Sequence, residues 1–414
     1  MLKDSLASAV SQDFQDYEII VSDNNSTDDT RTVADQFIAS SQKIKYINPG
    51  RDLSMCDNWE YVLEHATGRY VLYLCDDDAL APNTLSYVHK LLDRFRMDVL
   101  VWRPGGYHHP DIPDPEVRGK FTYPYTSARL NKIASRPMIK ALCRFDWSVN
   151  GVIPKMLNCV VSRDAIAACR ERTGEFFVPP YPDFSAAAQL LSTNPSYHFI
   201  DLPLYVSGAS VVSNAGIRFN RKQKHAAYAS LFARDLLRGV PYQMPYLVTS
   251  YFYATYLLFQ KLYPQTFVAD IDKRAYLETL FWELTQFEAY EDVSEEFRQL
   301  ADYMRDFSGS DEMFERLWRE HDLAKQNGDA QTRSHGLIAQ VKGLAWRSVS
   351  NYPRAFSLLA RVRGHKISEF SRKNVPSIGV AAKILSRHLD QYARSAISLE
   401  PIEVSSESFL KDWQ

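Results

Sequence analysis

The sequence predicts an α/β fold, in which a mostly parallel sheet is flanked by helices and followed by a mainly helical C-terminal domain. In roughly the first hundred residues, short apolar runs typical of buried strands alternate with amphipathic runs typical of helices. From about residue 220 onward, nearly every segment has the apolar spacing that is typical of helices. Parallel strands need a crossover between them, so the alternation favours parallel pairing.

The N-terminal elements are expected in strict alternation. The predicted strands cover residues 17–22, 44–47, 69–75 and 98–102, and the predicted helices cover residues 4–11, 29–39, 53–66 and 82–95. The polar turn Asp23–Asp28 can cap the second helix, and Gly68 is typical of a residue that ends the third.

The rest of the chain is expected to hold a long loop, a few further strands and many helices. Pro104–Pro124 is rich in Pro, Gly, His and Asp, which predicts a long and functional loop. Further strands are expected at 157–161 and 198–202, and helices at 128–143, from 163, and at 183–191, 222–238, 245–262, 271–288, 293–307 and 311–325. We expect three domains, at 1–213, 214–330 and 331–414.

Composition narrows the class of protein. A net charge of −2 over 414 residues argues against nucleic-acid binding. Five cysteines without a C-x-x-C pair indicate reduced thiols, and therefore a cytoplasmic protein. We expect no signal peptide at the N-terminus, and no apolar run reaches the ~18 residues that a membrane helix needs.

Three consecutive aspartates, Asp76, Asp77 and Asp78, directly follow the apolar run Tyr70–Cys75. Such a run predicts a buried strand, and open α/β sheets bind ligands at the carboxyl ends of their strands. Three adjacent carboxylates repel one another, so a hard divalent cation shared with substrate phosphates fits them. The alternative is a solvated turn or a helix N-cap, although a cap needs only one acid.

Three segments together resemble a known family. Tyr17–Thr30, Met55–Glu60 and Gly68–Asp78 are similar to the nucleotide-sugar-binding half of a family 2 glycosyltransferase with the GT-A fold. The resemblance is clear over about residues 1–95 and continues more faintly to about residue 210.

The resemblance implies a nucleotide-sugar donor and a Mg²⁺ or Mn²⁺ ion that stabilises the departing diphosphate. Family members often carry an acid where Cys75 stands, and cysteine is a poor ligand for these ions. We therefore assign first Asp78 and then Asp76 to the metal, and Asp77 to the ribose or to a structural bond.

Two further donor contacts follow from the resemblance. Asp23 ends its strand at the same sheet edge, where it would accept a hydrogen bond from the base or the ribose, and Asn25 in the same turn is assigned to the donor with it. The alternative for Asp23 is a turn aspartate that binds its own backbone.

An inverting transfer also needs a base for the acceptor hydroxyl. In the family this acid opens a helix, and Asp183 takes that place here, although Pro182 replaces the usual preceding acid. The alternative for Asp183 is a helix N-cap. Asp146, next to Trp147, is the second candidate for the base.

One feature departs from the family. Its members usually begin with a strand and a loop that contacts the base, whereas Met1 here stands at the start of the first helix. That strand would lie beside the one that ends at Asp23, so its neighbours would lack ladder partners. Either the chain starts upstream, or something else fills the slot, or the protein is impaired.

Other features have simpler explanations. His108, His109 and Asp111 could form a metal cluster, but adjacent histidines usually point apart, and a surface loop is favoured. Trp147 and Tyr181 could stack on a sugar, although aromatic residues are more often core. Residues 336–399 carry eleven Lys or Arg against two acids, which suits an anionic membrane or, as we prefer, a solvated helical face.

The combined prediction is a cytoplasmic, metal-dependent, inverting glycosyltransferase. It would move a sugar from a nucleotide donor to a glycan or lipid-linked glycan acceptor in surface polysaccharide synthesis, with peripheral membrane contact through the basic C-terminal segment as an option. The alternatives are a non-catalytic nucleotide-sugar-binding scaffold and a haloacid-dehalogenase-type phosphatase. The phosphatase family usually has Thr where Leu80 stands here.

Overall fold

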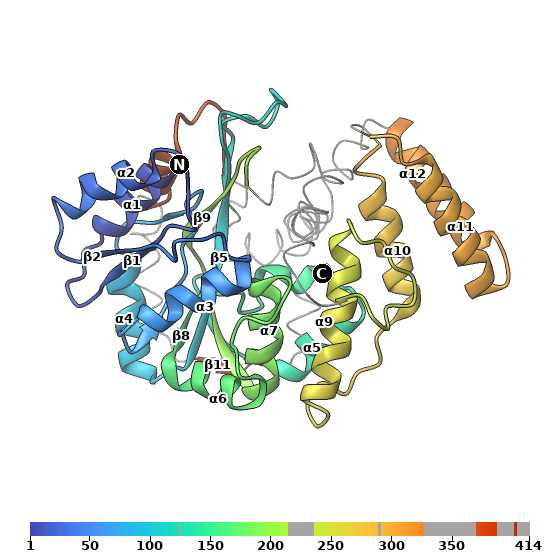
Figure 1. Ribbon diagram of the computed structural model, residues 1–414, viewed down its shortest axis with the longest axis horizontal. Coiled ribbons are helices and arrows are strands. Elements are labelled where there is room, and N and C mark those ends of the chain that lie inside the picture. The colour runs from blue at the N-terminus through green and yellow to red at the C-terminus, as the bar shows by residue number, and fades with distance from the viewer. Residues whose placement is uncertain (124–125, 214–235, 289–290, 327–369, 387–400, 404–414) are drawn as a thin grey trace, which may run out of the picture. The chain divides into compact units, whose positions relative to one another are not determined.

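The computed structural model describes residues 1–414 except 124–125, 214–235, 289–290, 327–369, 387–400 and 404–414 (Figure 1). The chain divides into two compact units. The first unit comprises Met1–Arg136, Gly151–Gly216 and Arg354–Phe409, and the second comprises Pro137–Asn150, Ile217–Pro353 and Leu410–Gln414. The three predicted domains stay a prediction, and most of the basic segment 336–399 lies outside the described residues.

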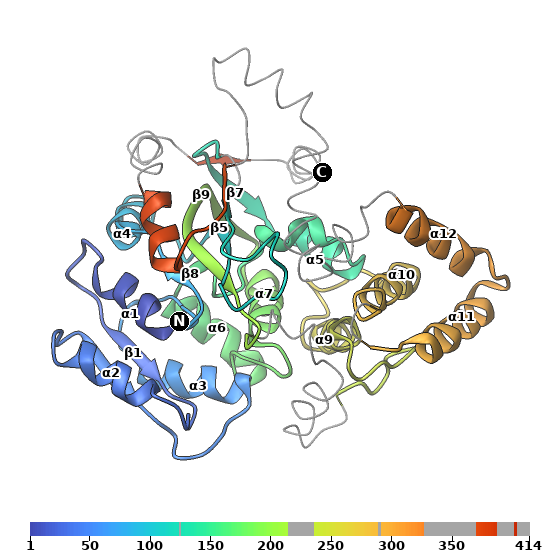
Figure 2. The same cartoon turned by 90° about the horizontal axis from the view of Figure 1, so that it is seen from above.

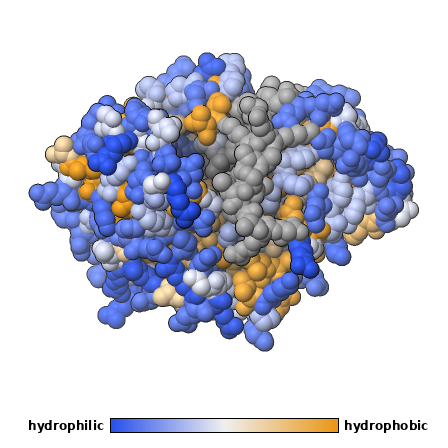
Figure 3. Space-filling model, in the orientation of Figure 1, coloured by the Kyte–Doolittle hydropathy of each residue, from blue (hydrophilic) through white to orange (hydrophobic). Residues whose placement is uncertain are grey.

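A small parallel sheet begins the first unit. Strand β1 (Ile19–Ser22) pairs in parallel with β2 (Ile44–Ile47). Helices α1 (Leu2–Val10), α2 (Thr30–Ile38) and α3 (Met55–His65) lie around these strands (Figure 2). The core of this region is small and apolar and consists of Leu6, Val21, Ala34 and Ile44. On the face in Figure 3, the described surface over these helices is mostly hydrophilic, as expected for helices packed by one side only.

The larger sheet of the unit is built on two long parallel strands, β5 (Val99–His108) and β9 (Ser196–Ala209). The other strands are β3 (Tyr70–Val71), β4 (Ala79–Leu80), β6 (Phe121–Tyr123), β7 (Leu130–Ala134), β8 (Cys159–Ser162), β10 (Phe370–Arg372) and β11 (Ile402–Glu403). Its helices are α4 (Thr84–Phe95), α6 (Arg163–Thr173) and α7 (Pro182–Thr193), with α5 (Ser135–Cys143) at the border of the units.

The α/β class with flanking helices is confirmed, but the expectation of mostly parallel pairing needs correction. Within the larger sheet, β5–β9 and β7–β11 are parallel, whereas the remaining described pairs are antiparallel. The alternation argument holds where a helix connects neighbouring strands, as between β1 and β2. It fails where a strand returns through a loop, as β6 does after β5.

Three predicted elements have other bounds in the structure. The strand expected at 69–75 is regular only over β3, and the loop expected at Pro104–Pro124 contains the end of β5 and all of β6. The helix expected at 128–143 begins as strand β7 and becomes helical only at α5. Pro137 explains this last difference, because proline is tolerated in the first turn of a helix and not in its interior.

Side chains of α1 support the chain that follows β3. Among the described residues β1 pairs only with β2, and β3 pairs only with β8. Ser5 Oγ of α1 donates to the Cys75 carbonyl (2.9 Å), Ser8 Oγ of α1 accepts from Leu80 N (3.0 Å), and Gln12 Nε2, two residues after α1, donates to the Ala81 carbonyl (3.0 Å). A helix thus supplies, through side chains, hydrogen bonds that a neighbouring strand would supply through its backbone.

The second unit is helical, as predicted. It contains α9 (Val248–Leu262), α10 (Lys273–Leu284), α11 (Ser294–Ser308) and α12 (Glu312–Gln326), and the helix expected at 222–238 lies outside the described residues. The buried carboxylate of Glu283 accepts hydrogen bonds from Val248 N (2.9 Å) and Thr249 N (3.0 Å), which caps the start of α9. None of the described helices is both long and apolar enough to cross a bilayer.

Candidate functional site

The acidic turn, residues 75–78, follows β3 in the first unit. Asp78 N donates to the Cys75 carbonyl at 3.1 Å, which closes the turn. Asp77 and Asp78 are 9% and 3% exposed, whereas Asp76 is exposed to solvent. One ligand atom from each of Cys75, Asp77 and Asp78 lies within 4.8 Å of the other two. Among the described residues this is the group that could hold a metal ion, and the assignment of Asp76 stays a prediction.

The ends of β5 and β9 hold the acidic turn. Gly208 N donates to Asp78 Oδ1 at 2.7 Å, and His109 Nε2 lies 3.1 Å from the Asp77 carbonyl oxygen. A Cβ atom on Gly208 would stand 1.7 Å from that same oxygen, so only glycine allows this approach. The backbone of β9 therefore binds the Asp78 carboxylate, and the side chain that directly follows β5 contacts the backbone of Asp77.

The histidine pair has a structural position. His109 is buried and contacts the acidic turn, and Asp111 accepts hydrogen bonds from Ser210 Oγ (2.6 Å) and Val211 N (3.1 Å). Asp111 thus fixes the chain after β9. These residues support the site from β5 and β9, and the described residues contain no metal-ligating group built from them.

The Cys75 thiol stays protonated. Burial raises its pKa well above the usual range, and the charges of Asp78, Asp77, Asp76 and Asp183 raise it further. A neutral thiol is a poor ligand for a hard divalent cation, so the carboxylates are the stronger ligands of the group. The electrostatic effect of Asp183 also places this carboxylate within reach of the acidic turn.

Asp183 lies in the first turn of α7, after Pro182. The N-cap residue is the half-buried Tyr181, so Asp183 is not the N-cap that its sequence position also allowed. Burial raises the pKa of Asp183, and the charge of Lys155 lowers it in part. A carboxylate with a raised pKa is a better proton acceptor than an ordinary one, which suits a general base.

Asp146 has a local role in the second unit. Its Oδ1 accepts a hydrogen bond from Ser148 N at 3.0 Å, at the start of the short 3-10 helix η1 (Trp147–Gly151). Trp147 is buried and packs against Phe252, with ring centroids 5.0 Å apart. A sugar-stacking role for Trp147 and a base role for Asp146 stay predictions.

The Asp23 turn, residues 23–26, follows β1. The Asp23 carboxylate accepts hydrogen bonds from Tyr46 Oη (2.5 Å) and Ser26 N (2.8 Å). Burial alone would raise the pKa of Asp23, but these hydrogen bonds outweigh it and the pKa is lowered. Asn25 has a positive φ of 60° and donates to Asp52 Oδ1 at 2.9 Å. The protein thus engages both residues itself, and their contact with a donor stays a prediction.

A family model supports the resemblance that the three segments carry. Residues 1–146 match the model of glycosyl transferase family 2. This match contains β1, the acidic turn and the histidine pair, which together form most of the geometry described above. The N-terminal region of this chain is therefore similar to glycosyl transferase family 2.

Two relatives match parts of this region. The chain is 39% identical over 87 residues to the GalNAc(5)-diNAcBac-PP-undecaprenol beta-1,3-glucosyltransferase of Campylobacter jejuni. The aligned region covers 21% of this chain and 28% of the relative. The chain is 30% identical over 132 residues to EpsE of Bacillus subtilis, which covers 29% of this chain and 48% of EpsE. The chain therefore spans less than half the length of either relative.

Two solved structures are similar over more of the chain. Residues 1–349 of TarS from S. aureus, in complex with UDP-GlcNAc, give a TM-score of 0.43 at 13% identity and cover 80% of this chain and 85% of that one. The mannosyltransferase PcManGT of Pyrobaculum calidifontis, in complex with GDP-Man and Mn²⁺, gives 0.39 at 16% identity and covers 83% of each chain. Since both TM-scores lie below 0.5, neither similarity bears on the activity of this chain.

Sequence reasoning missed the residues that position the acidic turn. Gly208 and His109 lie far from Asp77 in the sequence, and neither belongs to the segments that carry the resemblance. A glycine inside a strand often marks a close approach of another backbone, so the sequence could have suggested such a contact at Gly208. Only the fold identifies the acidic turn as its neighbour.

Proposed function

We propose that this protein is a metal-dependent glycosyltransferase that transfers a sugar from a nucleotide-sugar donor to a glycan acceptor with inversion. The observation that carries the proposal is the group of Asp77 and Asp78 carboxylates in a family 2 region, with Asp183 in electrostatic reach.

Asp78 is the first proposed ligand of a Mg²⁺ or Mn²⁺ ion. The second is Asp77 or Asp76, and the geometry favours Asp77, because it is buried beside Asp78 while Asp76 is exposed. A divalent ion held there would neutralise charge that develops on the leaving diphosphate. Asp23 and Asn25 are the proposed contacts to the base or ribose of the donor.

Asp183 is the proposed base. Its carboxylate would take the proton of the acceptor hydroxyl while the hydroxyl oxygen attacks the anomeric carbon. The new glycosidic bond forms as the bond from that carbon to the nucleoside diphosphate breaks, and attack from the opposite face inverts the configuration. The raised pKa of Asp183 supports this role.

A lipid-linked glycan is the acceptor class we favour. The name of the Campylobacter relative contains a diphosphate-linked undecaprenol, and we propose surface polysaccharide synthesis as the role of this chain on such an acceptor. A cytoplasmic protein that meets the membrane through its basic C-terminal segment would suit this acceptor.

Release of nucleoside diphosphate tests the proposal. The protein is incubated with a panel of UDP-, GDP- and dTDP-sugars, with Mn²⁺ or with EDTA, and with acceptor lipid extract. We expect release with at least one donor, its loss in EDTA, and its loss in Asp78→Ala and Asp183→Ala. Binding of donor without release from any member would favour a scaffold, and equal release from both variants would refute the proposed site.

A further inference from the structure

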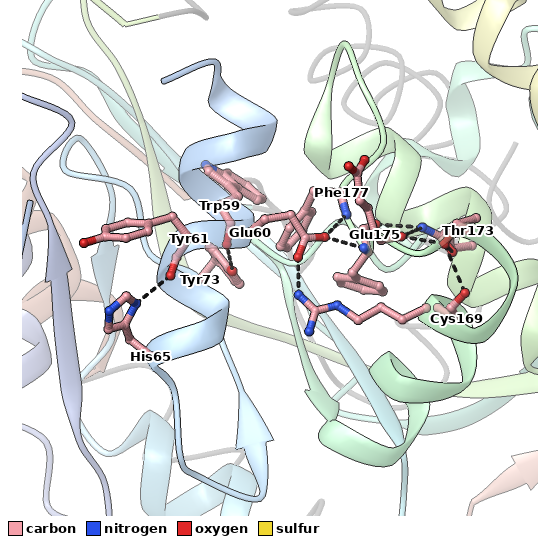
Figure 4. Close-up of polar contacts among 12 residues, drawn as sticks. Trp59, Glu60, Tyr61, His65, Tyr73, Cys169, Thr173, Glu175 and Phe177 are labelled. Atoms are coloured by element: carbon pink, nitrogen blue, oxygen red, sulfur yellow. Dashed lines mark hydrogen bonds and ion pairs between the residues drawn. The ribbon is translucent and has the colours of Figure 1, made fainter. Parts of the chain in front are cut away.

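Glu60 on α3 binds a turn that lies far from it in the sequence. Glu60 Oε1 accepts a hydrogen bond from Phe177 N at 2.6 Å and another from Phe176 N, and Glu60 Oε2 pairs with Arg170 (Figure 4). The side chain of Glu60 is only 15% exposed. One carboxylate therefore accepts hydrogen bonds from two backbone N–H groups and one guanidinium inside the first unit. Hydrogen bonds to a charged acceptor are stronger than those between neutral groups.

Helix α7 binds the same turn from the other side. Gln189 Nε2 donates to the Glu175 carbonyl at 3.0 Å and to the Phe176 carbonyl at 2.8 Å. Gln189 is fully buried. Residues 175–177, here named the bridging turn, thus offer their N–H groups to α3 and their carbonyls to α7.

Aromatic rings join the bridging turn to the segment between β3 and the acidic turn. Trp59 and Tyr73 are stacked with centroids 4.7 Å apart, and Phe177 packs edge-on to both at 5.2 Å (Figure 4). Tyr73 Oη also donates to the Trp59 carbonyl at 2.6 Å. Tyr73 stands two residues before Cys75, so this cluster reaches the start of the acidic turn.

The bridging turn also leads directly to the proposed base. Asp183 follows Phe177 by six residues and lies on α7, the helix that Gln189 ties to the turn. Helices α3 and α7 contact each other, and the charge of Asp183 raises the pKa of Cys56 on α3 after the larger effects of burial and of Asp57. The position of Asp183 therefore depends on α3 and on the bridging turn.

We propose that Glu60 is a positioning residue, which sets the place of Asp183 relative to the acidic turn through the bridging turn. This inference rests on the proposed glycosyl transfer. The Glu60 carboxylate binds two backbone N–H groups and Arg170, so its loss should lower the rate of the chemical step and leave donor binding intact. A displacement of about 1 Å at a reacting group can cost roughly 100-fold in rate.

Glu60→Gln is the test, and Glu18→Gln is its matched control. The Glu18 carboxylate also accepts backbone hydrogen bonds, from Thr67 N (2.6 Å) and Gly68 N (3.2 Å), but at the far end of α3. We expect kcat to fall about 10- to 100-fold in Glu60→Gln, with the Kd for donor and Mn²⁺ within about twofold by calorimetry. In Glu18→Gln both constants should stay within about twofold.

Hydrogen exchange gives a second readout. Peptides that cover residues 174–185 should exchange faster in Glu60→Gln and at the wild-type rate in Glu18→Gln. If Glu60→Gln fails to fold, Gln189→Met removes the contacts of the bridging turn to α7 and should give the same split between kcat and Kd.

The outcomes separate this inference from the proposed function. Turnover by the wild-type protein with an undiminished kcat in Glu60→Gln, or with a raised donor Kd as the sole change, overturns the positioning role alone. Absence of turnover in the wild-type protein with every donor overturns the proposed function, and the positioning role with it.

Discussion

The Asp23 turn and the acidic turn both follow a strand of the first unit, but the protein treats their carboxylates differently. Asp23 receives hydrogen bonds from Tyr46 and Ser26 directly on its two oxygens, and its pKa is lowered. In the acidic turn, Asp78 accepts a bond from Gly208 N on one carboxylate oxygen, and His109 contacts the backbone carbonyl of Asp77.

The contrast extends to Asp183. Burial raises its pKa, whereas hydrogen bonds lower that of Asp23, although both are acids that sequence reasoning assigned to one donor and acceptor site. A carboxylate whose charged form is stabilised by hydrogen bonds is a weak base and a good structural acceptor. A carboxylate whose charged form is disfavoured by burial is a better base. The comparison teaches that the protein stabilises the charged form of Asp23, which holds a turn, and disfavours that of Asp183, as the proposed base would require.

Gly208→Ala should have the largest effect, because it disrupts the contact of β9 with the acidic turn. The new Cβ would lie 1.7 Å from the Asp77 carbonyl oxygen, so the turn must move or β9 must shift. We expect roughly a 1000-fold loss of diphosphate release and about 1–3 kcal/mol less free energy of unfolding.

Gly151→Ala is the control for that substitution. A Cβ on Gly151 meets no atom within 4 Å, and its φ is not in the left-handed region. Activity and thermal unfolding of this variant should match the wild type. Equal activity of Gly208→Ala and the wild type would mean that the acidic turn needs no support from β9.

Three single substitutions in the acidic turn rank its carboxylates. Asp78→Asn and Asp77→Asn should each cost about 100-fold in Mn²⁺-dependent release, since each removes a buried charge from the proposed metal site. Asp76→Asn should cost less than about tenfold, because Asp76 is exposed and outside that group. Titration of each variant with Mn²⁺ measures the loss of affinity. The opposite order, with Asp76→Asn worse than Asp77→Asn, would restore Asp76 as the second ligand.

Local patterns predicted the strands and turns better than their contacts. The strand at 44–47 was predicted with the observed bounds, since Asn48-Pro49-Gly50 ends it unambiguously. The strand predicted at 198–202 extends as β9 to Ala209, because its pairing with β5 continues past a register shift that no local pattern reveals.

The site was predictable to a similar degree. Asp78 was assigned from an acidic run at a strand end, and Asp183 from the family resemblance at a helix start, and both roles stay predictions. The burial of Asp77, the exposure of Asp76 and the bond from Gly208 depend on strands more than a hundred residues apart, so packing alone decides them.

A smaller effect is expected at Lys155, which sharpens the contrast between Asp183 and Asp23. Lys155 lowers the pKa of Asp183, so Lys155→Met should raise this pKa. A base acts in its deprotonated form, and the acid limb of the pH–rate profile should therefore move to higher pH, with less activity along that limb. Lys155→Arg keeps the charge and should keep the profile. A shift of the limb to lower pH in Lys155→Met would contradict Asp183 as the base.

Tyr46→Phe should have the smallest effect on transfer, because Asp23 is the acid that holds a turn. The variant removes one hydrogen bond to a carboxylate that is 3% exposed, and we expect about 1–2 kcal/mol less free energy of unfolding in urea. Since the folded-state pKa of Asp23 is lowered, its contribution to stability is present above the unfolded pKa and is lost as pH falls. The acid-unfolding midpoint of Tyr46→Phe should therefore lie at higher pH than that of the wild type.

The kinetic constants of Tyr46→Phe complete the comparison. If Asp23 contacts the donor, the donor KM should rise about two- to fivefold, while kcat stays within about twofold, since no reacting atom moves. Tyr61→Phe is the control, because the Tyr61 hydroxyl makes only an exposed 3.4 Å contact to the Asn48 carbonyl, and its stability should change by less than about 0.5 kcal/mol. A large fall in kcat with an unchanged KM would instead move Asp23 from the donor-holding to the reacting acids.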